Sequence, residues 1–459
     1  MSRPVIAIVG AGFSGALTAL NILRPREVSA TAHLIEEAER FGVGAAFNTE
    51  EAGHLLNVRA QNMSADPDAP DEFVQWLARR RGAAPDPFAF ASRTDYGAYI
   101  QDRLRHVVQA GDAAGRLNLV QDSVVAIEAL ADGFRVRLGV GRELRADAVV
   151  VAIGNAPPSA AALPDPDIAD HPAYIGAPWR PGAFADVQPD DSVLLLGTGL
   201  TMIDVVASLE ARGHVGPLTA LSRHGLLPQA HARTIATTTA VWARGNGEPL
   251  SDALRRFRQA AQELPDWRIA FDGLRPITQH LWKTLDSEER RRFLRHLRPW
   301  WEIHRHRLAP RMAEALDAWR SDRLEVIAGR LTRTVPLDDG VEVAWRPRGT
   351  YAQAKRHVRW IVNCTGPEGD PRRLASPLVQ QLLRARLVRP DPYGLGLDVT
   401  EEGQLVDADG RPHSRLFGIG PIARGALWEI AAVPDIRVEA RRLGYRLARL
   451  DQAAVVAAG

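Results

Sequence analysis

Cysteine is almost absent from this sequence. Cys364 is the only cysteine in 459 residues, which excludes an internal disulfide framework, a CxxC redox pair and a cysteine-rich metal or iron–sulfur site. We therefore expect no metal. Because structural disulfides mark oxidising compartments, a chain without them fits a reducing cytoplasm, and we expect a cytoplasmic protein.

Lysine is nearly as scarce, and so is any excess of charge. Only two of the 57 Lys and Arg residues are lysines, so 55 are arginines, and the 55 Asp and Glu residues leave a net charge of +2. This balance excludes the broad basic field of a dedicated nucleic-acid binder. The preference for arginine is a compositional bias and indicates no function by itself.

Long apolar runs are also missing. The apolar start from Val5 to Leu23 is interrupted by Ser14, Thr18 and Asn21, so it is neither a signal peptide nor a membrane span, and we expect no membrane partner. With 46% hydrophobic and 24% charged residues, the chain can fill two or three cores at about 100 to 200 residues per domain.

A strand, a glycine turn and a helix open the chain in the order that a dinucleotide-binding fold requires. Val5–Val9 predicts a strand buried on both faces, and the motif GAGFSG follows at residues 10–15. Its three glycines permit, in order, a tight turn, close approach of a pyrophosphate and close packing of the helix. Glu36 stands 21 positions after Gly15, where an acid accepts a ribose hydroxyl.

The pattern of strand, glycine turn and helix recurs in the middle of the chain. Val193–Leu196 predicts a buried strand, and GTGLTM at residues 197–202 opens another helix, with Met202 in place of the third glycine. This helix is therefore expected to pack less closely on its strand. The next strand ends at Arg223, whose guanidinium suits a 2′-phosphate, so we favour NADPH over NADH. A solvated surface arginine is the alternative.

Between residues 250 and 320 the pattern is typical of helices. Asp286 and Glu289 form an expected capping pair at the start of one of them. The run His304–Arg311 lacks the spacing of a helical metal pair. Two interpretations of it stay open, a solvated basic face and an arginine-lined mouth for an anionic substrate or a cofactor phosphate.

Three further strands end in small residues. They are Val149–Asn155, Trp360–Pro367 and Leu416–Pro421. The first two fit places where the chain leaves one nucleotide fold and re-enters it. The third precedes a helix expected over Ala431–Leu443, whose N-terminus offers backbone donors to an electron-rich ring.

With these motifs the chain resembles the bacterial FAD/NAD(P)-binding flavoproteins, close to the class B type flavin monooxygenases and to their urate hydroxylase-like members. Phe41–Phe47, Leu55–Val58 and Tyr96–Tyr99 add to the resemblance. It implies an α/β fold with two Rossmann-like three-layer dinucleotide-binding domains and a helical insertion. We expect an FAD-binding domain at 1–165 and 356–459, and an NAD(P)H-binding domain at 185–345 that contains the insertion at 250–320.

Two related chemistries are excluded by the motifs. Disulfide reductases of similar layout carry a CxxC, which this chain lacks. The Baeyer–Villiger fingerprint FxGxxxHxxxW is also missing, because Ile277 and Leu281 stand where its His and Trp would follow Phe271.

The resemblance implies an FAD-dependent, NAD(P)H-using monooxygenase. Its partners would be dioxygen and a small substrate, a nitrogen heterocycle such as urate, hydroxylated through a flavin hydroperoxide in a dry pocket. Two alternatives stay open. One is an NAD(P)H oxidase or flavin-linked reductase without oxygen insertion, and the other is a non-catalytic flavin redox sensor.

No catalytic residue is assigned, but cofactor-binding residues are. They are Gly10, Gly12, Phe13, Ser14, Gly15, Glu36, Asn57, Gly154, Gly197, Gly199, Leu200, Thr201, Arg223, Thr365, Gly366, Gly420 and Trp428. Arg59 is the candidate anion partner of the substrate, and a structural arginine that bonds loop carbonyls is the alternative. We expect the substrate at the seam between the flavin domain and the helical insertion, because pockets favour domain interfaces.

Overall fold

The computed structural model describes residues 3–25, 30–49, 51, 53–109, 115–160, 163–232, 242–245 and 247–450. The chain divides into two compact units. Unit 1 comprises residues 1–52, 58–156 and 368–459, and unit 2 comprises residues 53–57 and 157–367.

Unit 1 is built on a sheet with the strand order β15-β16-β7-β1-β2-β3, in which only β15 runs antiparallel to its neighbour. Ile6, Ala7 and Ile8 of β1 have no solvent exposure. Because successive side chains point to opposite faces, both faces of β1 are covered. The strands of this sheet are β1 (Val5–Val9), β2 (Thr31–Glu36), β3 (Leu117–Gln121), β7 (Ala148–Val151), β15 (Gln404–Val406) and β16 (Pro412–Gly418).

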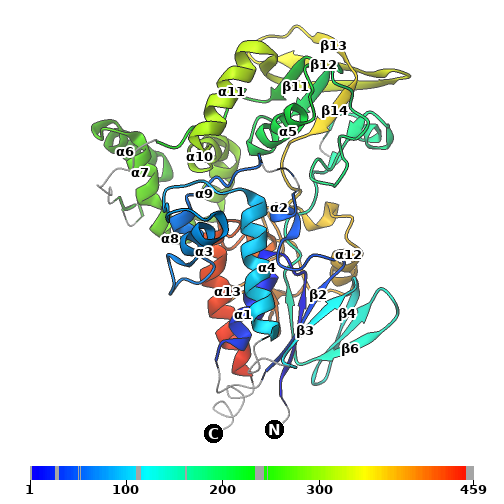
Figure 1. Cartoon of the computed structure of the whole chain (residues 1–459), viewed down its shortest axis with the longest axis vertical. Coiled ribbons are helices and arrows are strands. Elements are labelled where there is room, and N and C mark those ends of the chain that lie inside the picture. Colours follow the sequence, from blue (N-terminus) through cyan, green and yellow to red (C-terminus); the bar gives the residue numbers. More distant parts are fainter. Residues whose placement is uncertain are drawn as a thin grey trace. The chain divides into compact units, whose positions relative to one another are not determined.

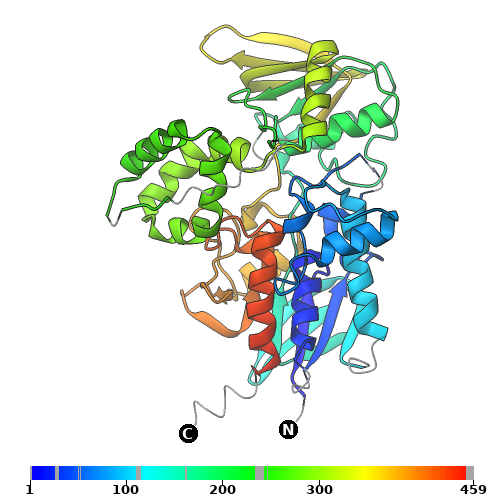
Figure 2. The same cartoon turned by 60° about the vertical axis from the view of Figure 1, so that its left-hand side comes forward.

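Helices and a second sheet complete unit 1. The chain's first and last long helices, α1 and α13, lie side by side (Figures 1 and 2). A Cβ added at Gly444 of α13 would lie 2.5 Å from Asn21 Cβ of α1, so this crossing needs a glycine. The helices are α1 (Phe13–Leu23), α2 (Gly44–Phe47), α3 (Glu72–Arg81), α4 (Arg93–Gln109), α12 (Pro377–Arg384) and α13 (Val433–Ala448). The small antiparallel sheet contains β4 (Val124–Leu130), β5 (Gly133–Leu138) and β6 (Glu143–Ala146).

Unit 2 repeats the parallel arrangement and extends it. Its strand order is β13-β12-β11-β10-β9-β14-β8, parallel from β11 to β8 and antiparallel from β11 to β13. The strands are β8 (Tyr174–Ile175), β9 (Val193–Leu196), β10 (Leu218–Ser222), β11 (Leu324–Leu337), β12 (Gly340–Pro347), β13 (Ala354–Val358) and β14 (Trp360–Asn363).

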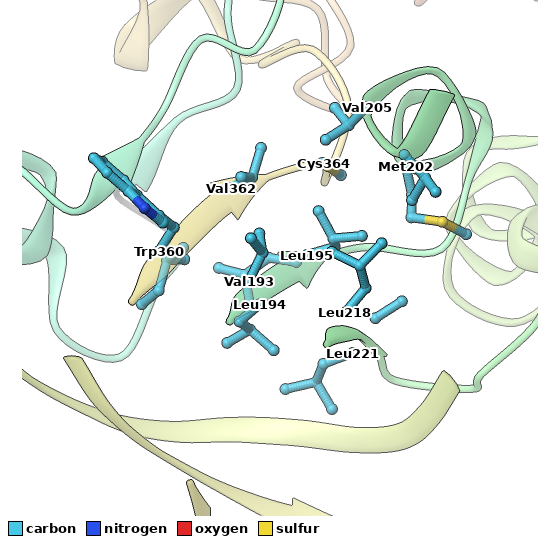
Figure 3. Packing of buried hydrophobic residues seen from close by; sticks show 14 of the residues in the cluster. Val193, Leu194, Leu195, Met202, Val205, Leu218, Leu221, Trp360, Val362 and Cys364 are labelled. Carbon is cyan, nitrogen blue, oxygen red and sulfur yellow. The ribbon is translucent and has the colours of Figure 1, made fainter. Parts of the chain in front are cut away.

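Apolar side chains of β9, β10, β14 and the helix α5 (Leu200–Ala211) form the core of unit 2 (Figure 3). Met202, which replaces the third glycine, is fully buried in this core. The Met202 side chain is therefore part of this core, and the looser packing of α5 on its strand stays a prediction.

The remaining helices of unit 2 lie in residues 250–322 and include a small core of their own around Phe257, Ala270 and Leu274. The expected capping pair is confirmed. The Asp286 carboxylate accepts a hydrogen bond from the Glu289 amide, and the Glu289 carboxylate accepts one from the Asp286 amide. These helices are α6 (Leu250–Glu263), α7 (Trp267–Leu274), α8 (Thr278–Thr284), α9 (Ser287–Arg292), α10 (Arg298–Arg305) and α11 (Pro310–Asp322). Two short helical turns, η5 (Arg275–Ile277) and η6 (Phe293–Leu297), lie within this segment. Those in other parts of the chain are η1 (Ala60–Asn62), η4 (Pro166–Asp170), η7 (Pro371–Arg373) and η8 (Gly420–Ala423).

Several boundaries differ from the expectation. Residues 53–57 and 157–165, which the sequence places in the flavin domain, belong to unit 2, and so do residues 356–367. The sequence places residues from 356 onward in the flavin domain, whereas β14 pairs along its whole length with β9 of unit 2. The strand belongs there because Trp360 and Val362 pack into the core of that unit. Within the described ranges, no helix is both long and apolar enough to cross a membrane.

Candidate dinucleotide sites

The turn between β1 and α1 requires glycine at two of its three glycine positions. Gly10 has φ +96°, and a Cβ there would lie 2.5 Å from the Ala152 carbonyl oxygen. A Cβ at Gly15 would overlap the Gly10 carbonyl oxygen. Gly12 is different, because the nearest atom to an added Cβ is Gly44 Cα at 3.5 Å, an ordinary contact. Packing within the protein does not require glycine at Gly12, so space for a ligand remains as the reason for it.

The first turn of α1 is suited to an anion. Gly12 is its N-cap, no side chain caps the helix, and no acidic residue stands in the first turn. The first amides of such a helix lack internal partners, and the helix dipole adds positive potential. A pyrophosphate fits this end by both hydrogen bonding and charge.

Glu36 connects the end of β2 to the glycine turn. Its Oε2 accepts a hydrogen bond from the Ala11 amide at 2.8 Å, and its Oε1 accepts one from the Ala38 amide at 3.3 Å. A carboxylate has about four acceptor positions, so it can accept a ribose hydroxyl as well. The geometry fits the role that the sequence predicts.

The C-terminal part of the chain returns to the same edge of the sheet. The Ile419 amide donates to the Val151 carbonyl at 3.1 Å, and Gly420 follows with φ +78° at the start of η8. A Cβ at Gly420 would overlap the Ser14 hydroxyl in the first turn of α1. Gly154, with φ +68°, has no atom within 4 Å of an added Cβ. Three segments far apart in the sequence therefore meet beside the first glycine turn.

This contact leads to a prediction for Gly420→Ala. The left-handed backbone costs about 1–2 kcal/mol for a residue with a Cβ, and the clash with Ser14 adds to that cost. The variant is therefore expected to unfold at a lower temperature and to bind flavin more weakly than Gly82→Ala. Gly82 has φ +61° and no atom within 4 Å of its Cβ position, so it isolates the backbone cost. Equal losses in the two variants, measured by thermal unfolding, would contradict the contact.

Two buried residues lie a few positions beyond η8. Trp428 is 2% exposed, and the Arg424 guanidinium lies 4.6 Å from the centre of its ring. Glu429 is 3% exposed and has φ +70°, a backbone region that residues other than glycine seldom adopt. Nothing in the sequence pattern distinguished Glu429, because neither its burial nor its backbone angle leaves a local signature.

The second glycine turn has the geometry of the first. Gly197 has φ +111°, and a Cβ there would overlap the Cys364 carbonyl oxygen, as one at Gly10 meets Ala152. Gly199 is the N-cap of α5 and has no atom within 4 Å of an added Cβ. Leu200 and Thr201 form the first turn of that helix, again without an acidic residue.

Two neighbouring strands end beside this second turn. The first is β10, whose last residue, Ser222, accepts a hydrogen bond at Oγ from the Thr198 hydroxyl of the turn at 2.9 Å. The exposed Arg223 follows Ser222. After β14, Asn363 Oδ1 accepts from the Thr365 amide and hydroxyl at 3.1 and 2.6 Å. Gly366 follows with φ +91° and open space at its Cβ position. Thr365 and Gly366 thus lie beside the second glycine turn.

The candidate substrate residue Arg59 and the candidate cofactor residue Asn57 belong to different units. Arg59, in unit 1, donates from Nη1 to the Phe88 carbonyl at 3.1 Å and lies over the Phe90 ring. These contacts match the structural alternative for this arginine. Asn57 belongs to unit 2, where its carbonyl bonds to His231 Nε2 at 2.9 Å. The substrate position at a seam between domains stays a prediction.

The run from His304 is not a uniformly solvated basic face. Arg307 is 3% exposed, forms an ion pair with Asp272 and lies over the Trp267 ring. His304 stacks on Phe271 with the ring centres 5.1 Å apart. The solvated interpretation is therefore wrong for Arg307, because aromatic packing of α7 and α10 covers it.

The chain's one thiol is not available for redox chemistry. Cys364 is buried in the core of unit 2, and burial raises its pKa well above the usual range. The thiolate is the reactive form of cysteine, so this residue is inert near neutral pH. In the described ranges, no three His, Cys, Asp or Glu side chains are grouped so that they could hold a metal ion.

Comparison with known families agrees with the first site. Residues 7–156 match the family described as FAD-NAD(P)-binding, so this segment is an FAD/NAD(P)-binding domain. A search of curated protein sequences found no match.

Solved structures match nearly the whole chain at low identity. L-lysine 6-monooxygenase from Pseudomonas syringae has a TM-score of 0.66 and 15% identity over 98% of this chain and 100% of its own. The FAD-bound cadaverine monooxygenase of the desferrioxamine pathway from Erwinia amylovora has a TM-score of 0.64 and 13% identity. The match covers 98% of this chain and 95% of that protein. Ornithine N-hydroxylase from Kutzneria sp. 744, with reduced FAD, NADP⁺ and L-ornithine, has a TM-score of 0.61 and 14% identity. The match covers 98% of this chain and 100% of that protein.

At these identities the likeness establishes the fold. The predicted fold class and the resemblance to flavoproteins with two dinucleotide-binding domains are confirmed. The urate of the expected reaction has no counterpart among these three proteins, whose names specify amines.

Proposed function

We propose that this chain is an FAD-dependent, NADPH-using monooxygenase that hydroxylates the nitrogen of a small primary amine. The observation that carries the proposal is the pair of equivalent glycine turns in one chain. The first turn is bonded to a carboxylate, Glu36, and Arg223 directly follows β10, the strand after the second turn. A carboxylate suits the free ribose hydroxyl of FAD, and a guanidinium suits the 2′-phosphate of NADPH.

The residues of unit 1 fit FAD. The amides at the start of α1 would donate to its pyrophosphate, Gly12 leaves room for the backbone to approach it, and Glu36 would accept a ribose hydroxyl. When bound, FAD supplies hydride acceptance from NADPH and reactivity toward dioxygen. In unit 2, the start of α5 and Arg223 would hold the corresponding groups of NADPH.

The substrate class comes from the three structural relatives. Their names specify lysine, cadaverine and ornithine, and each of these molecules ends in a primary alkyl amine. The amine, dioxygen, NADPH and one proton would give the hydroxylamine, water and NADP⁺. A primary amine therefore replaces the heterocycle as the proposed substrate.

The proposal predicts amine-dependent oxidation of NADPH. Purified protein should be yellow and should form one hydroxylamine per NADPH with at least one of lysine, ornithine and cadaverine, while urate gives no product. Measurement combines NADPH absorbance with mass spectrometry of the product. Stoichiometric hydrogen peroxide without any hydroxylated product would instead identify an oxidase. If NADPH does not reduce the flavin, the result would favour a redox sensor. If urate is hydroxylated, the substrate would be a nitrogen heterocycle and not a primary amine.

A further inference from the structure

A second turn of unit 2 lies beside the one that carries Arg223. Ser222, the last residue of β10, pairs in register with Ala328 of β11. On the other side of β11, the Arg348 amide donates to the Ala328 carbonyl at 2.9 Å. The β10 turn is also close, because a Cβ added at Gly225 would lie 3.1 Å from Ala328 Cβ. Ala328 thus has the Arg223 turn on one side and the β12–β13 hairpin on the other.

The charges of both arginines affect the pKa of the His224 imidazole. Burial lowers the pKa of this imidazole, and the charges of Arg348 and then Arg223 lower it further. The positive charges of both turns therefore act on the His224 side chain. Arg223 and Arg348 are both exposed, and neither forms an ion pair with a carboxylate within the part of the chain that the structure describes.

Two positive charges lie opposite each other on the neighbouring strands β11 and β12. Arg330 of β11 and Arg346 of β12 stand directly opposite each other in the antiparallel ladder. Arg348 lies in the turn directly after β12, two positions beyond Arg346. Like charges directly opposite each other destabilise a sheet, so an anion bound near the Arg330 and Arg346 pair would offset a cost that the fold otherwise carries.

We propose that Arg348, together with Arg223, binds the 2′-phosphate of NADPH and thereby selects NADPH over NADH. This inference rests on the proposed use of NADPH. A phosphate dianion accepts paired hydrogen bonds from guanidinium groups and matches their charge. The antiparallel extension β11–β13 (Figure 1) then has a role in recognition, since it brings a second guanidinium to the end of β10 from outside the parallel nucleotide fold.

Binding measurements on the flavin-loaded protein test this role without turnover. Calorimetry with NADP⁺, NAD⁺ and 2′,5′-ADP is compared for wild type, Arg348→Ala, Arg223→Ala and Arg212→Ala. Arg212 is the matched control, an exposed arginine at the C-terminal end of α5, away from the glycine turn. Thermal unfolding verifies that each exposed substitution leaves the fold intact.

Because Arg348→Ala loses a charge-assisted hydrogen bond, we expect its Kd for NADP⁺ and 2′,5′-ADP to rise by about 10- to 150-fold. The Kd for NAD⁺ should stay within about twofold, and Arg212→Ala should match wild type. Equal losses for NADP⁺ and NAD⁺ would assign Arg348 to the adenine or the ribose and overturn the inference. If wild type prefers NADP⁺ and Arg348→Ala keeps that preference, the inference is wrong while the proposed function stands. If wild type has no preference for NADP⁺, the use of NADPH itself is wrong.

Discussion

The Gly12→Val variant is expected to fold and to purify without its yellow colour. A Cβ at Gly12 makes only an ordinary contact with Gly44 inside the protein, whereas a valine side chain there would keep a pyrophosphate away from the α1 amides. Losing two charge-assisted hydrogen bonds costs about 3–6 kcal/mol. At about 1.4 kcal/mol per factor of ten, affinity for FAD falls by a hundredfold or more.

The measurement is flavin content per chain together with a titration of added FAD. Gly12→Ala is the milder companion, since its single added carbon tests the 3.5 Å contact with Gly44 alone. Binding of 2′,5′-ADP to unit 2 should be unchanged and reports that the variant is folded. Full flavin occupancy in folded Gly12→Val would mean that the first glycine turn does not hold FAD.

The Gly199→Val variant is expected to give the opposite pattern, with full flavin content and loss of NADPH-dependent flavin reduction. Gly199 caps α5 and has no protein atom within 4 Å of its Cβ position. Valine therefore fits inside the protein but blocks the approach of a nucleotide to the α5 amides. By the same energies as for Gly12, reduction at low NADPH concentration falls by about a hundredfold or more.

Stopped-flow reduction under anaerobic conditions measures this loss, and dithionite serves as a reductant that needs no nucleotide site. Dithionite should reduce the flavin of Gly199→Val at the wild-type rate. Undiminished reduction by NADPH would show that the second turn is not the NADPH site. The two valine variants together separate the two sites, because each should abolish one cofactor's binding and spare the other's.

The sequence was most informative where one residue's local geometry dictates its type. Gly10 and Gly197 adopt backbone angles and contacts that exclude a side chain, so the turns could be found from residue spacing alone. Glu36 and the Asp286–Glu289 cap were predictable for the same reason, since each bonds to backbone groups at a fixed place in its motif.

Contacts between distant segments left no such trace. β14 lies next to β9 because its apolar side chains fit the core of unit 2, and an apolar strand would suit either sheet. In a chain with 55 arginines, neither the burial of Arg307 nor the placement of Arg348 beside Ala328 is visible from composition. Both depend on which strands and helices become neighbours.

The position of β16 between β15 and β7 determines when unit 1 can be completed on the ribosome. This strand pairs with β7, yet residues 152–411 separate the two, and translation of that stretch takes roughly 13–52 s at 5–20 residues per second. During this time the edge of β7 lies open in the nascent chain, a state that favours pairing with other chains. Unit 2 ends at residue 367 and can fold within that interval, so flavin loading is expected to be the last step of maturation.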